Sequence, residues 1–323
     1  MIVLKIGGSS LRSIESLRQV TGVILSRPEP EKIVVLSAVS GVTNHLLRSA
    51  GEAMQSERRI GGLLDYLNLL HRELILGAIT DGRIQHRVLD EVAYLNSRLE
   101  KLLYGIAYTG ECSRRMRDLI LSMGERMAVQ LLAGALQDRG VEAQPLDADK
   151  IDIVASGEFG NGNAELETTA RLLPQHLRDL LRRGGIPVIT GFFGRTAEGH
   201  TITFGRGGTD YSAAVVAHAM EAEELQIWKD VDGFLTANPE IVPAARPLDY
   251  LAYDEAAELS YFGAAILHPR TVEPLSRKSI PAVIRNTYRP DAPGTRIGAE
   301  KQQHQEIIKS VVTNSDIGML RLH

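Results

Sequence analysis

Short runs of β-branched and other apolar residues recur along the chain, and segments with helical periodicity separate them. Five runs have the length and composition of buried strands, at residues 2–6, 33–37, 186–190, 225–229 and 281–285. Between the second and the third, apolar residues of 115–136 recur three and four positions apart, which is typical of one helix face. Strands that alternate with helices form a mainly parallel sheet covered on both faces. We therefore expect an α/β fold.

Composition and charge exclude several classes of partner. The chain has 323 residues, 44% of them hydrophobic and 24% charged, which is enough apolar material for one or two globular domains. A formal net charge of −4 provides no attraction to nucleic acid or to an anionic membrane surface, so neither is an expected partner. The lone Cys112 allows no internal disulfide, and the apolar run 2–6 is too short for a signal sequence or a membrane span. We expect a cytoplasmic protein.

Two internal segments depart from the alternation of strands and helices. Residues 51–110 have helical spacing and no convincing strand, which indicates a helical insertion. Residues 192–204 contain two short strand-like pieces around the turn residues 196–200, which predicts a hairpin. Such a hairpin can flank a functional site.

The first segment with a chemical signature is Lys5-Ile6-Gly7-Gly8-Ser9-Ser10, at the end of the first predicted strand. Paired glycines before a helix let backbone N–H groups approach a phosphate, and Lys5 supplies a point charge for phosphate oxygens. An ordinary strand-to-helix turn explains these residues equally well. The spacing matches neither a Walker A sequence nor a dinucleotide fingerprint.

The second segment is Gly205-Arg206-Gly207-Gly208-Thr209-Asp210, directly before the predicted helix 211–221. Glycines at a helix N-terminus favour an anion site, in which Arg206 can bind a carboxylate through two hydrogen bonds. Asp210 belongs either to the site or to the cap of the helix.

Three further segments have weaker signals. The polar loop 228–236 follows a predicted strand, where open α/β sheets bind ligands, although a solvated turn is the simpler interpretation. Glu125 lies on the apolar helix 115–136, either at its surface margin or held ready for a cation. Residues 37–44 are small and hydroxylated, and so can line a pocket.

Other chemistries have little support in this sequence. The histidines lack HExxH spacing and no cysteine cluster exists, so we predict no protein-built metal site. No GxSxG segment is present, which leaves no hydrolase nucleophile elbow. His268, before Pro269, is expected to close a helix that follows Asp254.

Taken in order, these segments resemble the amino acid kinase superfamily and, within it, the aspartokinases, over about residues 1–297. The resemblance rests on KxGGxS at the N-terminus, SGVTN, GER, GRGGTD, WKDVDG and the block from Glu255 to Pro269. It implies a three-layer α/β/α sandwich that transfers the γ-phosphoryl group of ATP to the β-carboxylate of L-aspartate, with Mg²⁺ as the metal ion. The product would be 4-phospho-L-aspartate, which opens the pathway to lysine, threonine and methionine.

The resemblance also implies roles for individual residues. Lys5 and Asp210 would be catalytic. The phosphates of ATP would be held by Lys5, Gly7, Gly8 and Ser9. The wall of the nucleotide pocket would be formed by Lys229, Asp230, Leu235 and Pro239. Aspartate would lie beside Thr43, Glu125, Phe192, Arg206, Gly208 and Thr209.

Departures from the family pattern concern the nucleotide side and the C-terminus. Leu235, Glu240 and Ala265 replace an aromatic residue, an arginine and a lysine that are frequent in the family. These replacements motivate one alternative, a non-catalytic regulatory or partner-binding subunit. A family member with another acceptor is the nearest alternative. A homodimer is expected by resemblance.

The end of the chain is expected to form a separate tail. Residues 1–300 would be the kinase domain, and residues 301–323 resemble the start of an ACT domain, a module that senses amino acids. A strand-like run at 307–313 would join the main sheet, pair with another subunit or begin such a domain. A separate ACT-bearing subunit is therefore a candidate partner.

Overall fold

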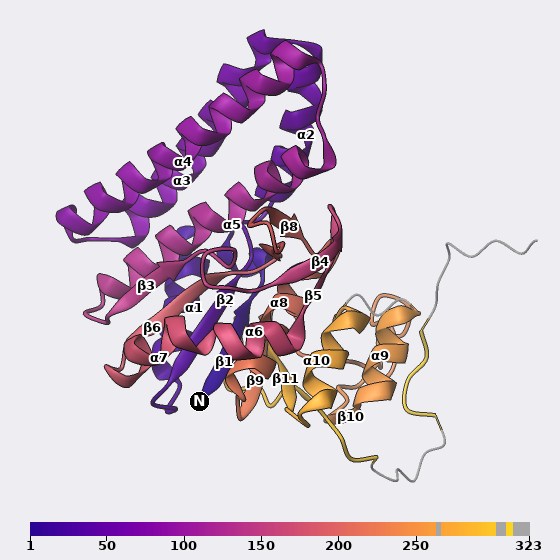
Figure 1. Cartoon of the computed structure of the whole chain (residues 1–323). Coiled ribbons are helices and arrows are strands. Elements are labelled where there is room, and N and C mark those ends of the chain that lie inside the picture. Colours follow the sequence, from indigo (N-terminus) through magenta and orange to yellow (C-terminus); the bar gives the residue numbers. More distant parts are fainter. Residues whose placement is uncertain (263–265, 302–307, 313–323) are drawn as a thin grey trace, which may run out of the picture.

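A computed structural model describes residues 1–262, 266–301 and 308–312 of the chain (Figure 1). Its centre is an eight-stranded sheet with the order β10-β12-β11-β9-β1-β2-β6-β3. These strands are β1 Ile2–Ile6, β2 Lys32–Leu36, β3 Ala143–Leu146, β6 Ile186–Thr190, β9 Glu224–Lys229, β10 Tyr250–Ala252, β11 Ala282–Asn286 and β12 Thr295–Gly298. Every neighbouring pair is parallel except β11 with β12, so the central strands end on one common edge.

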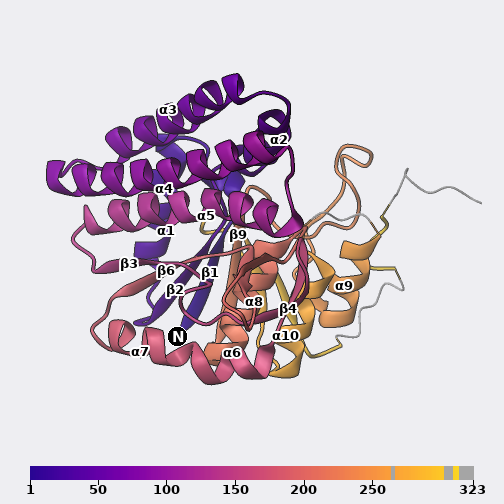
Figure 2. The same cartoon turned by 45° about the horizontal axis from the view of Figure 1, so that its top comes forward.

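Helices cover both faces of this sheet (Figure 2). One layer consists of α1 Ile14–Ser26, α2 Val42–Gln55, α3 Ile60–Ala78, α4 Gly82–Thr109 and α5 Arg114–Gln137. The other consists of α6 Leu166–Leu172, α7 Pro174–Arg182, α8 Gly208–Met220, α9 Tyr253–Tyr261 and α10 Val272–Arg277. Within β1, Leu4 and Ile6 belong to the first core and Val3 to the second, because successive side chains of a strand point to opposite faces. The expected three-layer α/β/α sandwich is confirmed.

Local signals set the ends of the long helices. The Asp81 side chain accepts hydrogen bonds from the backbone N–H groups of Arg83 and Ile84 and so caps α4. Gly110, with φ of 68°, ends α4 in the left-handed conformation that glycine tolerates. Among the described residues, α5 is long and apolar enough to cross a membrane, but 89% of its most apolar window is buried inside the fold. It is packed as a core helix.

The five predicted strands are all present, each within a residue of its expected position. The hairpin predicted at 192–204 consists of β7 Phe193–Arg195 and β8 Thr201–Thr203, which pair antiparallel. A second hairpin, β4 Ala155–Glu158 with β5 Asn161–Ala164, was not predicted. The stretch 51–110 is helical, comprising the end of α2, the short η2 Glu57–Arg59, α3 and α4. The sequence missed β3, β10 and β12 because they are short strands towards the sheet edges.

Two expectations about the C-terminal part differ from the structure. The described part of the strand-like run, 308–312, is not a strand, because it lies on the loop after β9 rather than on a sheet edge: the Val311 N–H donates to the Thr236 carbonyl at 2.9 Å. Residues 307 and 313 lie outside the described residues. His268 does not close α9, which ends at Tyr261; its side chain caps the short η3 Pro269–Thr271.

Candidate active site

A cavity of about 470 Å³ opens at the edge of the sheet where β1, β2, β6 and β9 end, beside the N-terminus of α8. Loops at the carboxyl ends of parallel strands are the usual ligand sites of open α/β sheets. The cavity brings together eleven of the predicted site residues: Lys5, Gly8, Ser9, Thr43, Glu125, Phe192, Arg206, Gly208, Thr209, Asp210 and Lys229. The segment 37–44 also lines it, as expected.

Four predicted residues do not line this cavity. The Gly7 N–H is directed away and donates to the Trp228 carbonyl at 3.2 Å, so it is not free for a phosphate. Asp230, Leu235 and Pro239 belong to the loop after β9, outside the cavity wall. This loop is instead tied to the C-terminal residues, since the Ser310 hydroxyl donates to the Leu235 carbonyl at 2.8 Å. Ala265 lies outside the described residues.

Lys5, Asp210 and Lys229 form a buried ionic cluster at the cavity wall. The Asp210 carboxylate lies 2.8 Å from the Lys5 ammonium and 3.0 Å from that of Lys229. Burial lowers the pKa of Lys5, although the neighbouring Asp210 opposes this shift. Burial also disfavours the Asp210 carboxylate, but the two ammonium groups outweigh it and hold the pKa of that carboxyl below its usual value. Two cations against one anion leave positive charge for a ligand.

Asp210 does not cap α8, which was the alternative left open by the sequence. The helix begins at Gly208 with Gly207 as its N-cap, so Asp210 lies inside the first turn. Gly207 has φ of 68°, and a Cβ there would lie 2.3 Å from the Cβ of His268. Glycine is therefore required where α8 meets the cavity.

Glu125 is buried on α5, 3% exposed, and not at the helix margin. Its Oε1 accepts a hydrogen bond from the Ala38 N–H at 3.2 Å, whereas Oε2 has no partner in the part of the chain that the structure describes. Burial raises the pKa of the carboxyl to about 8. Gly124 makes the approach possible, because a Cβ at this position would lie 2.8 Å from the Ala38 Cβ. A buried oxygen without a partner is costly, so we expect a ligand to supply a hydrogen-bond donor or a cation to the Glu125 Oε2.

Another part of the cavity wall is formed by Phe192 and the glycine loop before α8. Phe192 has φ of 72°, a conformation that is rare for a bulky residue and is typical of functional sites. A Cβ on Gly208 would lie 2.9 Å from the Phe192 ring, so glycine permits this packing. Arg206 is exposed and has no ion-pair partner among the described residues. Its guanidinium is free to bind a carboxylate.

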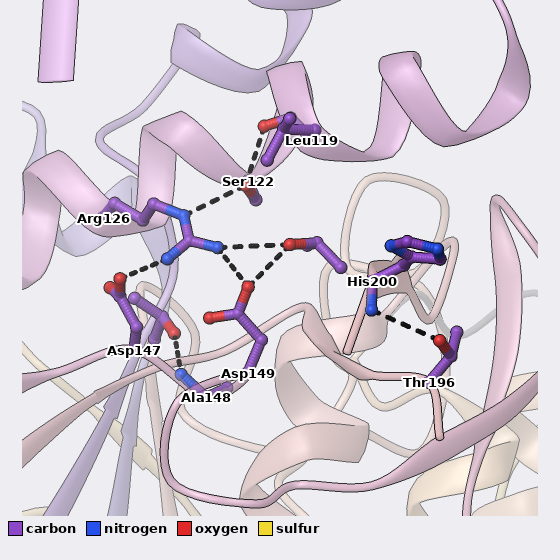
Figure 3. A network of polar contacts seen from close by, with 10 residues as sticks. Leu119, Ser122, Arg126, Asp147, Ala148, Asp149, Thr196 and His200 are labelled. Carbon is purple, nitrogen blue, oxygen red and sulfur yellow. Dashed lines mark hydrogen bonds and ion pairs between the residues drawn. The ribbon is translucent and has the colours of Figure 1, made fainter. Parts of the chain in front are cut away.

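A buried network centred on Arg126 was not predicted (Figure 3). Arg126, the neighbour of Glu125, pairs with Asp147 and with Asp149, the latter at 2.5 Å, and donates to the Ser122 hydroxyl at 3.2 Å. Its guanidinium also stacks 4.7 Å from the Phe193 ring centroid. The sequence showed Arg126 within a motif but contained no signal for its distant partners. The network joins α5 to the hairpin that begins beside Phe192.

No three potential ligands among histidine, cysteine, aspartate and glutamate gather as a metal site within the described ranges. Asp210 is fully engaged by two lysines, and Glu125 is a single carboxyl. The cavity therefore offers cations and N–H groups, as an anionic ligand requires.

The chain is similar to known kinases in sequence. The model of the amino acid kinase family matches residues 1–286. Aspartokinase 1, chloroplastic, from Arabidopsis thaliana is 37% identical over 320 residues, which cover 98% of this chain and 55% of that protein. Lysine-sensitive aspartokinase 3 from Escherichia coli (strain K12) is 31% identical over 331 residues, which cover 100% of this chain and 69% of that protein. The chain thus spans little more than half the length of the plant relative.

The fold is similar to solved structures. The crystal structure of Escherichia coli aspartokinase III in complex with aspartate and ADP superposes with a TM-score of 0.84 at 31% identity, covering 94% of this chain and 65% of that chain. The lysine and aspartate complex of the same enzyme superposes with a TM-score of 0.81. Isopentenyl phosphate kinase, at 18% identity and a TM-score of 0.51, shares the fold alone.

Proposed function

The chain belongs to the amino acid kinase family and, within it, to the aspartokinases, and from this premise we propose that it transfers the γ-phosphoryl group of ATP to the β-carboxylate of L-aspartate. The product is 4-phospho-L-aspartate. One observation carries the proposal: the buried Lys5, Asp210 and Lys229 cluster lines the same cavity as Arg206 and Glu125. Aspartate and ADP in the similar Escherichia coli structure support this substrate pair.

A carboxylate acceptor explains why this site contains no catalytic histidine. The β-carboxylate is ionised at neutral pH and is already a nucleophile, so no general base is needed. The reaction instead requires in-line positioning and neutralisation of charge on the phosphates. Lys5 and Lys229 supply that charge, and Asp210 holds both ammonium groups in place. Lys5 and Asp210 are therefore the proposed catalytic residues.

The cavity supports recognition of an α-amino acid. Arg206 binds the α-carboxylate, and the unpartnered Oε2 of Glu125 receives the ammonium group. Ionised Glu125 is favoured by that ammonium, which offsets the burial that raises its pKa. The remaining proposed aspartate contacts are Thr43, Phe192, Gly208 and Thr209.

The proposed nucleotide side begins at Gly8 and Ser9, where β1 gives way to η1 Gly8–Leu11. A Cβ on Gly8 would lie 2.7 Å from the Ala38 carbonyl oxygen, so this turn requires glycine. We propose that the adenine base of ATP lies against Asp230, Leu235 and Pro239, which belong to the loop after β9 and do not line the cavity. Mg²⁺ would neutralise charge on the phosphates of ATP, and Lys5, Gly8 and Ser9 would hold those phosphates. Glycine loops and lysines suit those phosphates.

Formation of aspartyl hydroxamate by the purified chain tests the proposal. We expect product that depends on ATP, Mg²⁺ and aspartate, with little from glutamate. Product with another carboxylic acid alone would support a different acceptor. Absence of turnover despite ATP binding would support a non-catalytic subunit, the alternative that Leu235, Glu240 and Ala265 motivate.

Several finer features are also proposals. A kinase domain at 1–300 with a tail at 301–323, a homodimer, and a separate ACT-bearing subunit follow from the family resemblance. We also propose that the protein is cytoplasmic and that its product is used in the synthesis of lysine, threonine and methionine. Inhibition by lysine or threonine, measured with and without candidate subunits, would test the regulatory part.

A further inference from the structure

A second cavity, of about 220 Å³, is lined in part by Arg126 and Asp149 of the buried arginine network. It shares no lining residue with the larger cavity. Its walls come from α4, the first half of α5, the loop after β3 and the turn of the β7–β8 hairpin. The lining residues are Arg98, Arg115, Leu119, Arg126, Asp149, Lys150, Gly199, His200 and Thr201.

The charges around this cavity are unbalanced. Arg126 is neutralised by Asp147 and Asp149, which share its guanidinium. Arg98, Arg115 and Lys150 have no ion-pair partner within the described part of the chain. Four cationic groups therefore face two carboxylates, and the three that lack a salt bridge repel one another.

The hydrogen-bonding pattern shows which groups are available to a ligand. Arg115 lies 3.2 Å from the His200 Nε2, and because a guanidinium can only donate, the imidazole accepts through that nitrogen. The Thr201 hydroxyl is committed, since it donates to Asp149 at 2.6 Å. The free donors are consequently the remaining N–H groups of the two arginines and the Lys150 ammonium. All of them select an anion.

The walls are held in place before any ligand arrives. The hairpin turn is fixed by two hydrogen bonds to Thr196. The Gly199 N–H donates to its carbonyl at 2.9 Å. The His200 N–H donates to its hydroxyl at 3.3 Å (Figure 3). Asp149 is fixed by Arg126. A site whose walls are already ordered loses less free energy on binding.

We propose that this cavity binds a small dianion, a phosphate group or a short dicarboxylate, through Arg98, Arg115 and Lys150. Paired guanidinium groups match both chemistries, because each presents two parallel N–H donors to a pair of oxygens. The volume is below the roughly 300–1,000 Å³ of sites for drug-sized ligands, which excludes a whole nucleotide. Binding here does not require turnover at the other cavity.

Calorimetric titration of the full chain with inorganic phosphate, and separately with succinate, tests the site. Saturating ADP and aspartate are present throughout, so that the larger cavity is filled. We expect at least one probe to bind, and the double variant Arg115→Gln/Lys150→Gln to weaken its affinity by about tenfold or more, the effect of losing charge-assisted hydrogen bonds. The probe that binds distinguishes the phosphate source from the dicarboxylate.

The matched control is Arg72→Gln/Lys101→Gln, which removes the same two charges from exposed positions on α3 and α4 outside the cavity. Affinity should be unchanged in this variant. Equal weakening in both double variants would show a general charge effect and overturn the site. Failure of both probes to bind the unmodified chain, or full affinity in Arg115→Gln/Lys150→Gln, would overturn it as well. Arg115 and Lys150 are exposed, so a far-ultraviolet spectrum suffices to verify folding.

Discussion

Lys5 and Asp210 meet as a buried ion pair at 2.8 Å, although one belongs to the first strand and the other to the first turn of α8. The pair fixes the N-terminus of α8 against the end of β1, and with it the glycine loop that carries Arg206. Lys229, at the end of β9, approaches the second carboxylate oxygen. The strands β1 and β9 and the helix α8, which are far apart in the sequence, therefore each contribute one charged residue to the same cluster.

Replacement of Lys5 by methionine should lower kcat by about 100- to 1,000-fold, the usual effect of removing one preorganised group that stabilises transition-state charge. The KM for aspartate should change little, because Arg206 and Glu125 remain. Steady-state hydroxamate kinetics measure both constants. Lys32→Met, at the opposite end of the neighbouring β2, is the control. Normal turnover in Lys5→Met would remove this lysine from the mechanism.

Replacement of Arg206 by alanine should raise the aspartate KM by about tenfold or more while the KM for ATP stays nearly constant, because a charge-assisted bidentate contact is lost. Arg206→Lys should restore only part of the affinity, since an ammonium lacks the planar fork. Separate titrations of both substrates give the answer. Replacement of Arg178, an exposed residue of α7, by alanine should leave both constants unchanged. A defect confined to ATP would contradict the assigned role.

Sequence patterns predicted the parts of the fold that depend on local chemistry. The buried strands, the helix containing Glu125 and the hairpin after Phe192 were all predicted, because apolar periodicity and turn residues are local properties. The strand β3 is interrupted by a glutamine and a proline, and β10 is only 3 residues long, so pairing with neighbours decides their structure rather than propensity.

The residues of the candidate site could be predicted where they lie together in one short motif. Contacts between residues that are far apart in the sequence could not. Lys5 and Arg206 lie in short glycine-rich segments, and such segments predict an anion-binding site. Nothing local shows that Asp210 turns towards two lysines instead of capping α8, or that Arg126 meets Asp149. Such partnerships arise from the order of parallel strands, which brings separate loops to one edge.

The pKa of Glu125 predicts a pH dependence of aspartate binding. Burial raises the pKa to about 8, so the free enzyme holds this carboxyl protonated below that pH, whereas the substrate ammonium requires it ionised. The kcat/KM for aspartate should therefore rise with pH, reach half of its maximum near pH 8 and level off above that pH. Profiles recorded from pH 6 to 9 measure this dependence. Glu125→Gln should have a much lower, flat profile, and Glu91→Gln the profile of the unmodified chain; an equally steep rise in Glu125→Gln would contradict the assignment.

The same shift affects stability, with a defined sign. Between the unfolded value of 4.5 and about 8, the folded chain keeps a proton on Glu125 that the unfolded chain has lost. Folding is therefore linked to proton uptake, and this group makes the free energy of unfolding fall by about 1.4 kcal/mol for each pH unit in that window. Urea unfolding at several pH values should show a weaker decline for Glu125→Gln than for the unmodified chain. Identical slopes would show that Glu125 is ionised in the apo fold.

Replacement of Arg126 by glutamine tests whether its network positions the aspartate site. Loss of the guanidinium leaves Asp147 and Asp149 without their partner, which should lower the free energy of unfolding by about 3–5 kcal/mol in urea denaturation. Because Arg126 neighbours Glu125 and contacts Phe193, the aspartate KM should rise more than kcat falls. Arg126→Lys should restore part of the stability and of the KM together, and exposed Arg139→Gln should alter neither. A loss of stability with an unchanged aspartate KM in the folded fraction would mean that the network supports the fold alone, since a positioning role requires the two effects to move together.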